Sequence, residues 1–169
     1  MDYTDPRNPF EIAFFDRGPV SQEEIFLGGY WSTYWYNGRI YAAEIVRGID
    51  VFRLTPSEHL SEAEIEAAEL VQLEQFNAQL QPRVTWPAAV PVARAYLDQM
   101  VRSGRILETR AAELRSVLER ADAGRASDTE LRQAAARIES DVAAIRAGTL
   151  GGDAERLGRI AEVLRSLAG

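Results

Sequence analysis

The stretch 28–55 constrains the fold more than any other part of the chain; it reads GGYWSTYWYNGRIYAAEIVRGIDVFRLT. Asn37-Gly38 lies between two runs of aromatic and β-branched residues, and both residues tolerate the positive φ of a type I′ turn. Arg47-Gly48 indicates a second tight turn. The stretch therefore predicts three antiparallel strands joined by two hairpins.

The alternation of side chains along these strands predicts which residues share a face of the sheet. With loops at Asn37-Gly38 and Arg47-Gly48, the second hairpin pairs Val46 with Ile49 and Glu44 with Val51. One face then carries Tyr30, Ser32, Tyr34, Tyr41, Ala43, Ile45, Phe52 and Leu54, and the other carries Trp31, Thr33, Trp35, Ile40, Ala42, Val46, Ile49 and Val51. Because both faces are apolar, we expect a covering layer on each side.

A fourth strand is predicted at residues 11–16, a short apolar and β-prone segment that Gly18-Pro19 ends. Four antiparallel strands within about forty-five residues match the size of one propeller blade. The expected fold class is α+β: a four-stranded antiparallel, propeller-blade-like sheet followed by an α-helical region that ends in a small three-helix bundle.

The helical half begins at a capping-box pattern, Ser61 with Glu64, which predicts a helix to about residue 78. Apolar stripes at helical spacing predict four more helices, at 90–103, 107–122, 128–147 and after Asp153. Short loops make the last three neighbours antiparallel. The expected domains are a β-blade at 1–56, a helical connector packing on it at 57–104, and an Ala/Arg-rich helical bundle at 105–169.

Composition excludes several classes of function. The net charge is −7 and all nineteen cations are arginines, interleaved with glutamates, which argues against nucleic-acid binding. There is no cysteine, so disulfides and thiolate chemistry are excluded. No apolar run approaches the roughly twenty residues of a membrane span. The polar, acidic start of the chain indicates no signal peptide, which would leave the chain as written in the cytoplasm.

Candidate catalytic and metal-binding residues are few. His59 is the single histidine, which rules out a multi-histidine metal site, and its place among polar residues favours a solvated loop over a catalytic triad. The glutamates at 58–69 lack the spacing of a calcium loop and suit the start of a helix. We therefore expect no catalytic residue, no metal site and no cofactor.

Four aromatic residues of the first two predicted strands are candidates for a ligand or interface site. Their rings could stack on a ligand such as a sugar, or pack in the core and between blades. These residues are Trp31, Tyr34, Trp35 and Tyr36.

Glu44 is a further candidate because it falls in the middle of a strand on an otherwise apolar face. A buried carboxylate requires a partner. A structural ion pair with Arg47 or Arg53 would supply one; alternatively, Glu44 lines the mouth or channel of a larger assembly.

Three segments carry a resemblance to a known family: NPFEIAFFDRGP at 8–19, GGYWSTYWYNG at 28–38 and GIDVFRL at 48–54. Together they resemble the last repeat of bacterial LVIVD-repeat proteins, which are predicted to form β-propellers. The resemblance covers about residues 2–56. It implies a secreted or cell-surface propeller with no established activity, catalytic residue or cofactor. The implied partners are upstream blades of a longer chain, or a second copy held through sheet edges.

The first functional hypothesis is thus a non-catalytic binding or scaffold module, the C-terminal blade and helical cap of an LVIVD-type propeller. One alternative is the C-terminal part of a propeller hydrolase whose catalytic residues lie in upstream blades. Another is a self-contained small α+β interaction protein, which a cooperative monomeric melt would favour.

Overall fold

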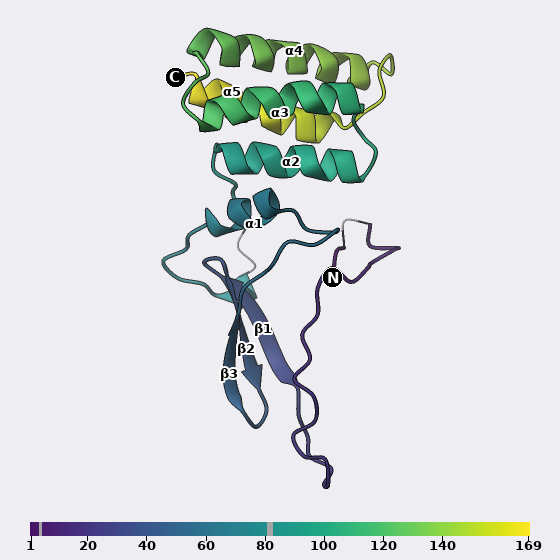
Figure 1. Cartoon of the computed structure of the whole chain (residues 1–169), viewed down its shortest axis with the longest axis vertical. Coiled ribbons are helices and arrows are strands. Elements are labelled where there is room, and N and C mark those ends of the chain that lie inside the picture. The colour runs from purple at the N-terminus through teal and green to yellow at the C-terminus, as the bar shows by residue number, and fades with distance from the viewer. Residues whose placement is uncertain (4, 81–82) are drawn as a thin grey trace.

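The computed structural model describes residues 1–3, 5–80 and 83–169 and confirms the α+β class with an antiparallel sheet and helices. The helices stack at one end of the molecule, and the sheet extends away from them (Figure 1). The strands are β1 (Tyr30–Tyr36), β2 (Arg39–Glu44) and β3 (Gly48–Phe52), in the order β1-β2-β3. The helices are α1 (Glu62–Glu69), α2 (Val90–Arg102), α3 (Glu108–Asp122), α4 (Asp128–Arg146) and α5 (Ala154–Leu167), with a short 3₁₀ helix η1 (Ala78–Leu80).

The first hairpin has the predicted turn and register. Asn37 and Gly38 have φ angles of 49° and 78°, the positive values that a type I′ turn requires. Tyr36 pairs with Arg39 and Tyr34 pairs with Tyr41. The local side-chain signal therefore predicted this turn correctly. A bulge interrupts the pairing of β1 with β2 between Tyr30 and Ser32, near the start of β1.

The second hairpin differs from its prediction: Glu44 pairs with Gly48 and Tyr41 pairs with Val51. The predicted pairing of Glu44 with Val51 is therefore wrong, and the loop is residues 45–47 rather than Arg47-Gly48. The cause lies in Glu44, whose side chain accepts hydrogen bonds from the backbone N–H groups of residues 46 and 47 and closes the turn around itself.

The observed register of β3 differs from the predicted one by three residues, because Glu44 pairs with Gly48 instead of Val51. A shift by an odd number of residues moves every side chain of a strand to the other face of the sheet. Ile49 and Val51 consequently lie on the same face as Tyr34 and Tyr41, while Phe52 lies on the opposite face. The aliphatic residues of β3 and the tyrosines of the first hairpin thus form one surface.

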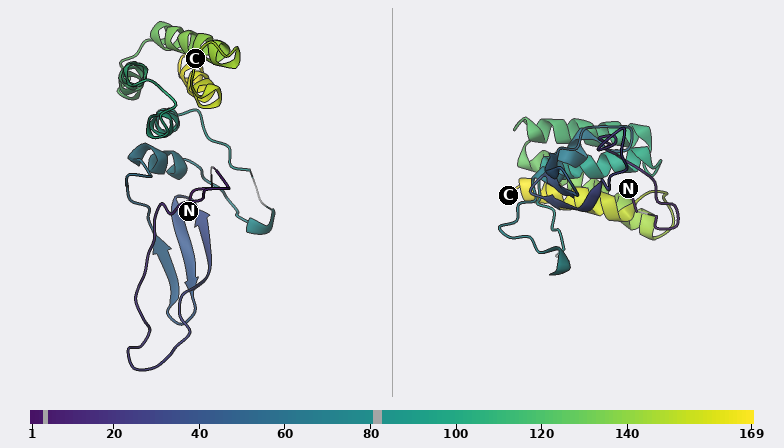
Figure 2. Two further views of the ribbon diagram at one scale, coloured as in Figure 1. Left: turned by 90° about the vertical axis from the view of Figure 1, so that its right-hand side faces the viewer. Right: turned by 90° about the horizontal axis from the view of Figure 1, so that it is seen from below.

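The predicted fourth strand is not seen. Residues 11–16 form no strand and run beside the sheet, as the purple N-terminal segment in Figure 2 shows. The ring of Phe15 lies 4.7 Å from that of Phe52, and Arg17 donates a hydrogen bond to Asp50 at 2.6 Å. Because Asp50 and Phe52 share one face of β3, these contacts hold the segment against that face. Its backbone is therefore not placed at the edge of the sheet, where it could join the ladder.

Helix α1 starts at the predicted capping box. The Ser61 hydroxyl accepts from the Glu64 N–H, and the Glu64 carboxylate accepts from the Ser61 N–H. The helix ends at Glu69 rather than near residue 78. After it, the chain turns back to the sheet, where the Leu73 N–H donates to the Asn37 side-chain oxygen at 2.8 Å. This hydrogen bond replaces the one that a longer helix would supply.

The four C-terminal helices share one core, and α2, expected in the connector at 57–104, is part of it. Leu97 and Met100 of α2 are fully buried in the same core as Leu118 of α3, Ile138 of α4 and Ile160 of α5. The three predicted helices therefore form a four-helix unit with α2.

Helix α1 docks on α2 and connects the sheet to this unit. Small buried side chains, among them Ala67 and Ala95, let the two helices approach closely. Arg102 adds hydrogen bonds to both oxygens of the Glu64 carboxylate, at 2.7 and 3.0 Å. Burial opposes ionisation of Glu64, but the hydrogen bonds from Arg102, Ser61 and Gln99 outweigh it and lower the pKa of the carboxyl group.

Candidate functional site

One face of the sheet, here called the open face, exposes apolar side chains from all three strands. Tyr34 is 48% exposed, Ile49 is 73% exposed and Val51 is 56% exposed. Soluble proteins seldom leave contiguous apolar surface of this kind unless it binds something. The open face is therefore the first candidate for a functional surface.

The opposite face of the sheet is better protected. Ala42 is fully buried there, and the segment at 11–17 lies against Phe52 and Asp50. The Tyr30 hydroxyl donates to Asp50 at 2.7 Å, and burial together with this hydrogen bond raises the pKa of Tyr30. The chain itself thus supplies a partial layer on this face.

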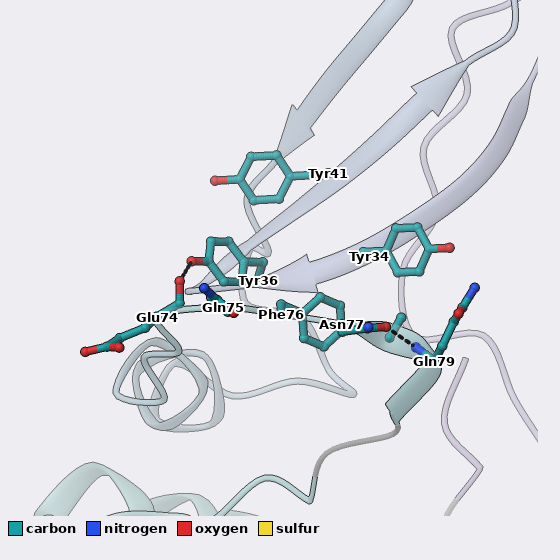
Figure 3. A pocket seen from close by; sticks show the side chains of 9 residues that line it. Tyr34, Tyr36, Tyr41, Glu74, Gln75, Phe76, Asn77 and Gln79 are labelled. Atoms are coloured by element: carbon teal, nitrogen blue, oxygen red, sulfur yellow. Dashed lines mark hydrogen bonds between the residues drawn. The ribbon is translucent and has the colours of Figure 1, made fainter.

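A row of four aromatic rings lies at the helix-side end of the open face. The order is Tyr34, Phe76, Tyr36 and Tyr41, and the ring centroids of each neighbouring pair are 6.3 Å apart. This distance is within the range of favourable aromatic pairs. Phe76 comes from the segment after α1 and lies between Tyr34 and Tyr36 in Figure 3.

These rings line a groove of about 950 Å³ between the sheet and the segment at 74–79, here called the aromatic groove. Its remaining lining is Glu74, Gln75, Asn77, Ala78 and Gln79. The Glu74 carboxylate points away from the rings, whereas the Asn77 side chain lies beside Phe76 (Figure 3).

The segment that carries Phe76 is held in place by the first hairpin. The Asn37 amide donates to the Leu73 carbonyl at 3.1 Å and accepts from its N–H at 2.8 Å. The Tyr36 hydroxyl also donates to the Leu73 carbonyl, at 2.9 Å. The Asn77 side-chain oxygen then accepts from the Gln79 N–H at 3.0 Å. Four side-chain hydrogen bonds therefore define one wall of the groove.

The structure brings two of the four predicted aromatic candidates together. Tyr34 and Tyr36 line the aromatic groove, whereas Trp35 lies on the opposite face and Trp31 lies at the bulge of β1, 72% exposed. Tyr41 and Phe76 were missed as site residues. Pairing across the hairpin could have indicated Tyr41, which was already predicted opposite Tyr34.

The carboxylate of Glu44 is buried and takes its hydrogen bonds from backbone N–H groups. It is 6% exposed and accepts hydrogen bonds from the backbone N–H groups of Gly29 at 3.0 Å, Val46 at 2.8 Å and Arg47. Burial opposes its ionisation, but these three hydrogen bonds outweigh that effect and hold the pKa of Glu44 below its ordinary value. Glu44 thus closes a turn, and Arg47 contributes a favourable charge nearby.

His59 packs edge-on against the ring of Phe10, with centroids 5.1 Å apart, and its Nε2 lies 3.6 Å from the Glu58 carboxylate. In the described part of the chain, no three His, Asp or Glu side chains gather as metal ligands. Across the same residues, no helix combines the length and the apolar character that crossing a membrane requires.

Fold and site together define an α+β protein in which an open-faced sheet with an aromatic groove is connected through α1 to a four-helix unit. No family model, curated protein or solved structure matches this chain.

Proposed function

We propose that this protein is a non-catalytic binding or scaffold module whose sheet packs, through its open face, on a neighbouring β-sheet. The observation that carries the proposal is the exposed aliphatic pair Ile49 and Val51 on the open face. Burying such side chains contributes about 25 cal/mol per Å² of apolar surface removed from water. A second sheet is the natural partner, because apolar faces of two sheets interdigitate well.

The placement of the helices supports this proposal. They stack beyond the end of the sheet and leave its open face uncovered over most of its length (Figure 1). A self-contained domain would be expected to cover that face with its own helices. The opposite face already has a partial layer in residues 11–17, so one covering layer remains to be supplied.

The sheet suits the position of a propeller blade, whose faces pack on neighbouring blades, and here the open face is the one left for such a neighbour. On this proposal the segments at 8–19, 28–38 and 48–54 make the last blade of an LVIVD-type propeller, and the helices cap it. The partners are then upstream blades, or a second copy when those blades are absent. Such a propeller would work outside the cytoplasm, at the cell surface or as a secreted protein.

The test is the mass of the purified chain by light scattering over a hundredfold range of concentration, with a thermal melt. We expect concentration-dependent association that Ile49→Asp reduces, because a charge on the open face opposes its burial. The matched control is Val46→Asp, an exposed position in the β2–β3 turn. A cooperative monomer at every concentration that binds no apolar dye would overturn the proposal.

A further inference from the structure

We propose that the aromatic groove binds a neutral oligosaccharide. The groove is built entirely from this chain, by β1, β2 and the segment at 74–79, so no second sheet is needed to form it. The inference therefore extends beyond the proposed function, and the two can be tested separately.

Stacking surface is the first requirement for such a ligand, and the aromatic row supplies it. Tyr34, Phe76 and Tyr41 are exposed to solvent while they line the groove. One face of a pyranose ring presents mainly C–H groups. Stacking this apolar face on an aromatic ring removes it from water, which favours binding. These three exposed rings belong to a row in which neighbouring centroids are 6.3 Å apart, so they offer stacking positions for more than one sugar unit.

Hydrogen-bonding groups of both kinds are the second requirement. The amides of Gln75, Asn77 and Gln79 line the groove beside the rings. Each primary amide has two N–H donors and one carbonyl acceptor, which matches sugar hydroxyls that donate and accept. The hydroxyls of Tyr34 and Tyr41 add groups of the same kind. Binding sites for small ligands typically combine apolar walls with a few such polar groups.

Charge selects a neutral ligand over an acidic one. No arginine is found among the described residues that line the groove, and the single carboxylate, that of Glu74, points away from the rings (Figure 3). A phosphate or uronate would lack a cationic partner here. An aliphatic peptide would find little match either, since Ala78 is the single aliphatic residue in the described lining.

The groove is also ordered before a ligand arrives. Asn37 and Tyr36 together make three hydrogen bonds to the backbone of Leu73, three residues before Phe76. Holding a binding segment in place reduces the conformational entropy that binding would otherwise cost. The rings of the two walls are thus positioned for a rigid ligand.

The test is isothermal titration of the full chain with three neutral hexasaccharides: cellohexaose, maltohexaose and N-acetylchitohexaose. At least one should bind with a Kd below about 1 mM, equivalent to about 4 kcal/mol. Phe76→Ala and Tyr34→Ala should each weaken that binding by roughly tenfold or more, as truncation of aromatic anchors does. Trp31→Ala removes an exposed aromatic residue outside the groove and should leave the Kd within about twofold.

Three outcomes would overturn the inference: no heat of binding with any of the three sugars, equal loss in Trp31→Ala and Phe76→Ala, or binding unchanged in both groove variants. Thermal melts of each variant verify that it is folded, and Tyr34→Ala retains the segment at 74–79 if Phe76→Ala disturbs it. Ile49→Asp separates the two proposals, because it should reduce self-association while leaving sugar binding intact.

Discussion

The side chain of Asn37 and the backbone of Leu73 are joined by a reciprocal pair of hydrogen bonds across thirty-six residues of sequence. The amide of Asn37 imitates a neighbouring β-strand, since it donates to the carbonyl and accepts from the N–H of a single residue. The same residue adopts the positive φ that the hairpin turn requires. One side chain therefore shapes the hairpin and fixes the wall of the aromatic groove.

Asn37→Gly tests this relationship, because glycine keeps the positive φ while losing the amide. We expect a loss of about 1–2 kcal/mol in the free energy of unfolding, the typical effect of two lost hydrogen bonds. Hydrogen exchange at Leu73 should accelerate more than exchange in β1. The control is Gln79→Gly, another amide on the groove segment; equal destabilisation by both would contradict the role given to Asn37.

Glu44→Gln should lower the urea midpoint of the protein at neutral pH. Its carboxylate accepts three backbone N–H groups, and an amide has one acceptor oxygen in place of two. Glu23→Gln, at an exposed glutamate, is the matched control. Equal midpoints for the two variants would contradict a structural role for the Glu44 carboxylate.

The stability contributed by Glu44 should also depend on pH. Because its pKa is lowered in the folded protein, this stability is present above the pKa of an unfolded glutamate, about 4.3, and is lost as pH falls toward the folded value. Urea midpoints measured from pH 7 to pH 3 should fall less steeply in Glu44→Gln than in the wild type. Parallel profiles would show that Glu44 is not the group responsible.

Arg102→Gln should weaken the junction between α1 and α2. Both oxygens of Glu64 lose a partner, and the expected cost is about 1 kcal/mol, since Arg102 is partly exposed to solvent. Proteolysis between the sheet and α2 should become faster. Arg165→Gln breaks the more exposed pair with Glu139 and should leave proteolysis at the junction unchanged.

Leu97→Ala should destabilise the whole helical unit, although Leu97 lies outside α3, α4 and α5. It is fully buried in the core shared by these helices, and removing such a side chain costs about 2–5 kcal/mol. The helical signal by circular dichroism should melt in one transition at lower temperature. Leu107→Ala, at an exposed position, should shift the free energy by less than about 0.5 kcal/mol.

Several features were predictable from sequence because a few neighbouring residues decide them. Asn37-Gly38 specified its turn, and Ser61 with Glu64 specified the start of α1. The apolar stripes placed α2 to α5 within a residue or two of their observed bounds. Each of these signals acts within one turn of helix or one hairpin, so no distant contact was needed.

The open face and its groove were decided by tertiary structure. The register of β3 depends on Glu44, whose carboxylate also accepts the N–H of Gly29, the residue just before β1. Phe76 reaches the tyrosines because Asn37 holds Leu73, and residues 11–16 lie on a face because Arg17 meets Asp50. These contacts join residues that lie 15, 36 and 33 positions apart. Local propensity carries no information about such pairs, so sequence determined the elements while long-range hydrogen bonds determined which side chains form the surface.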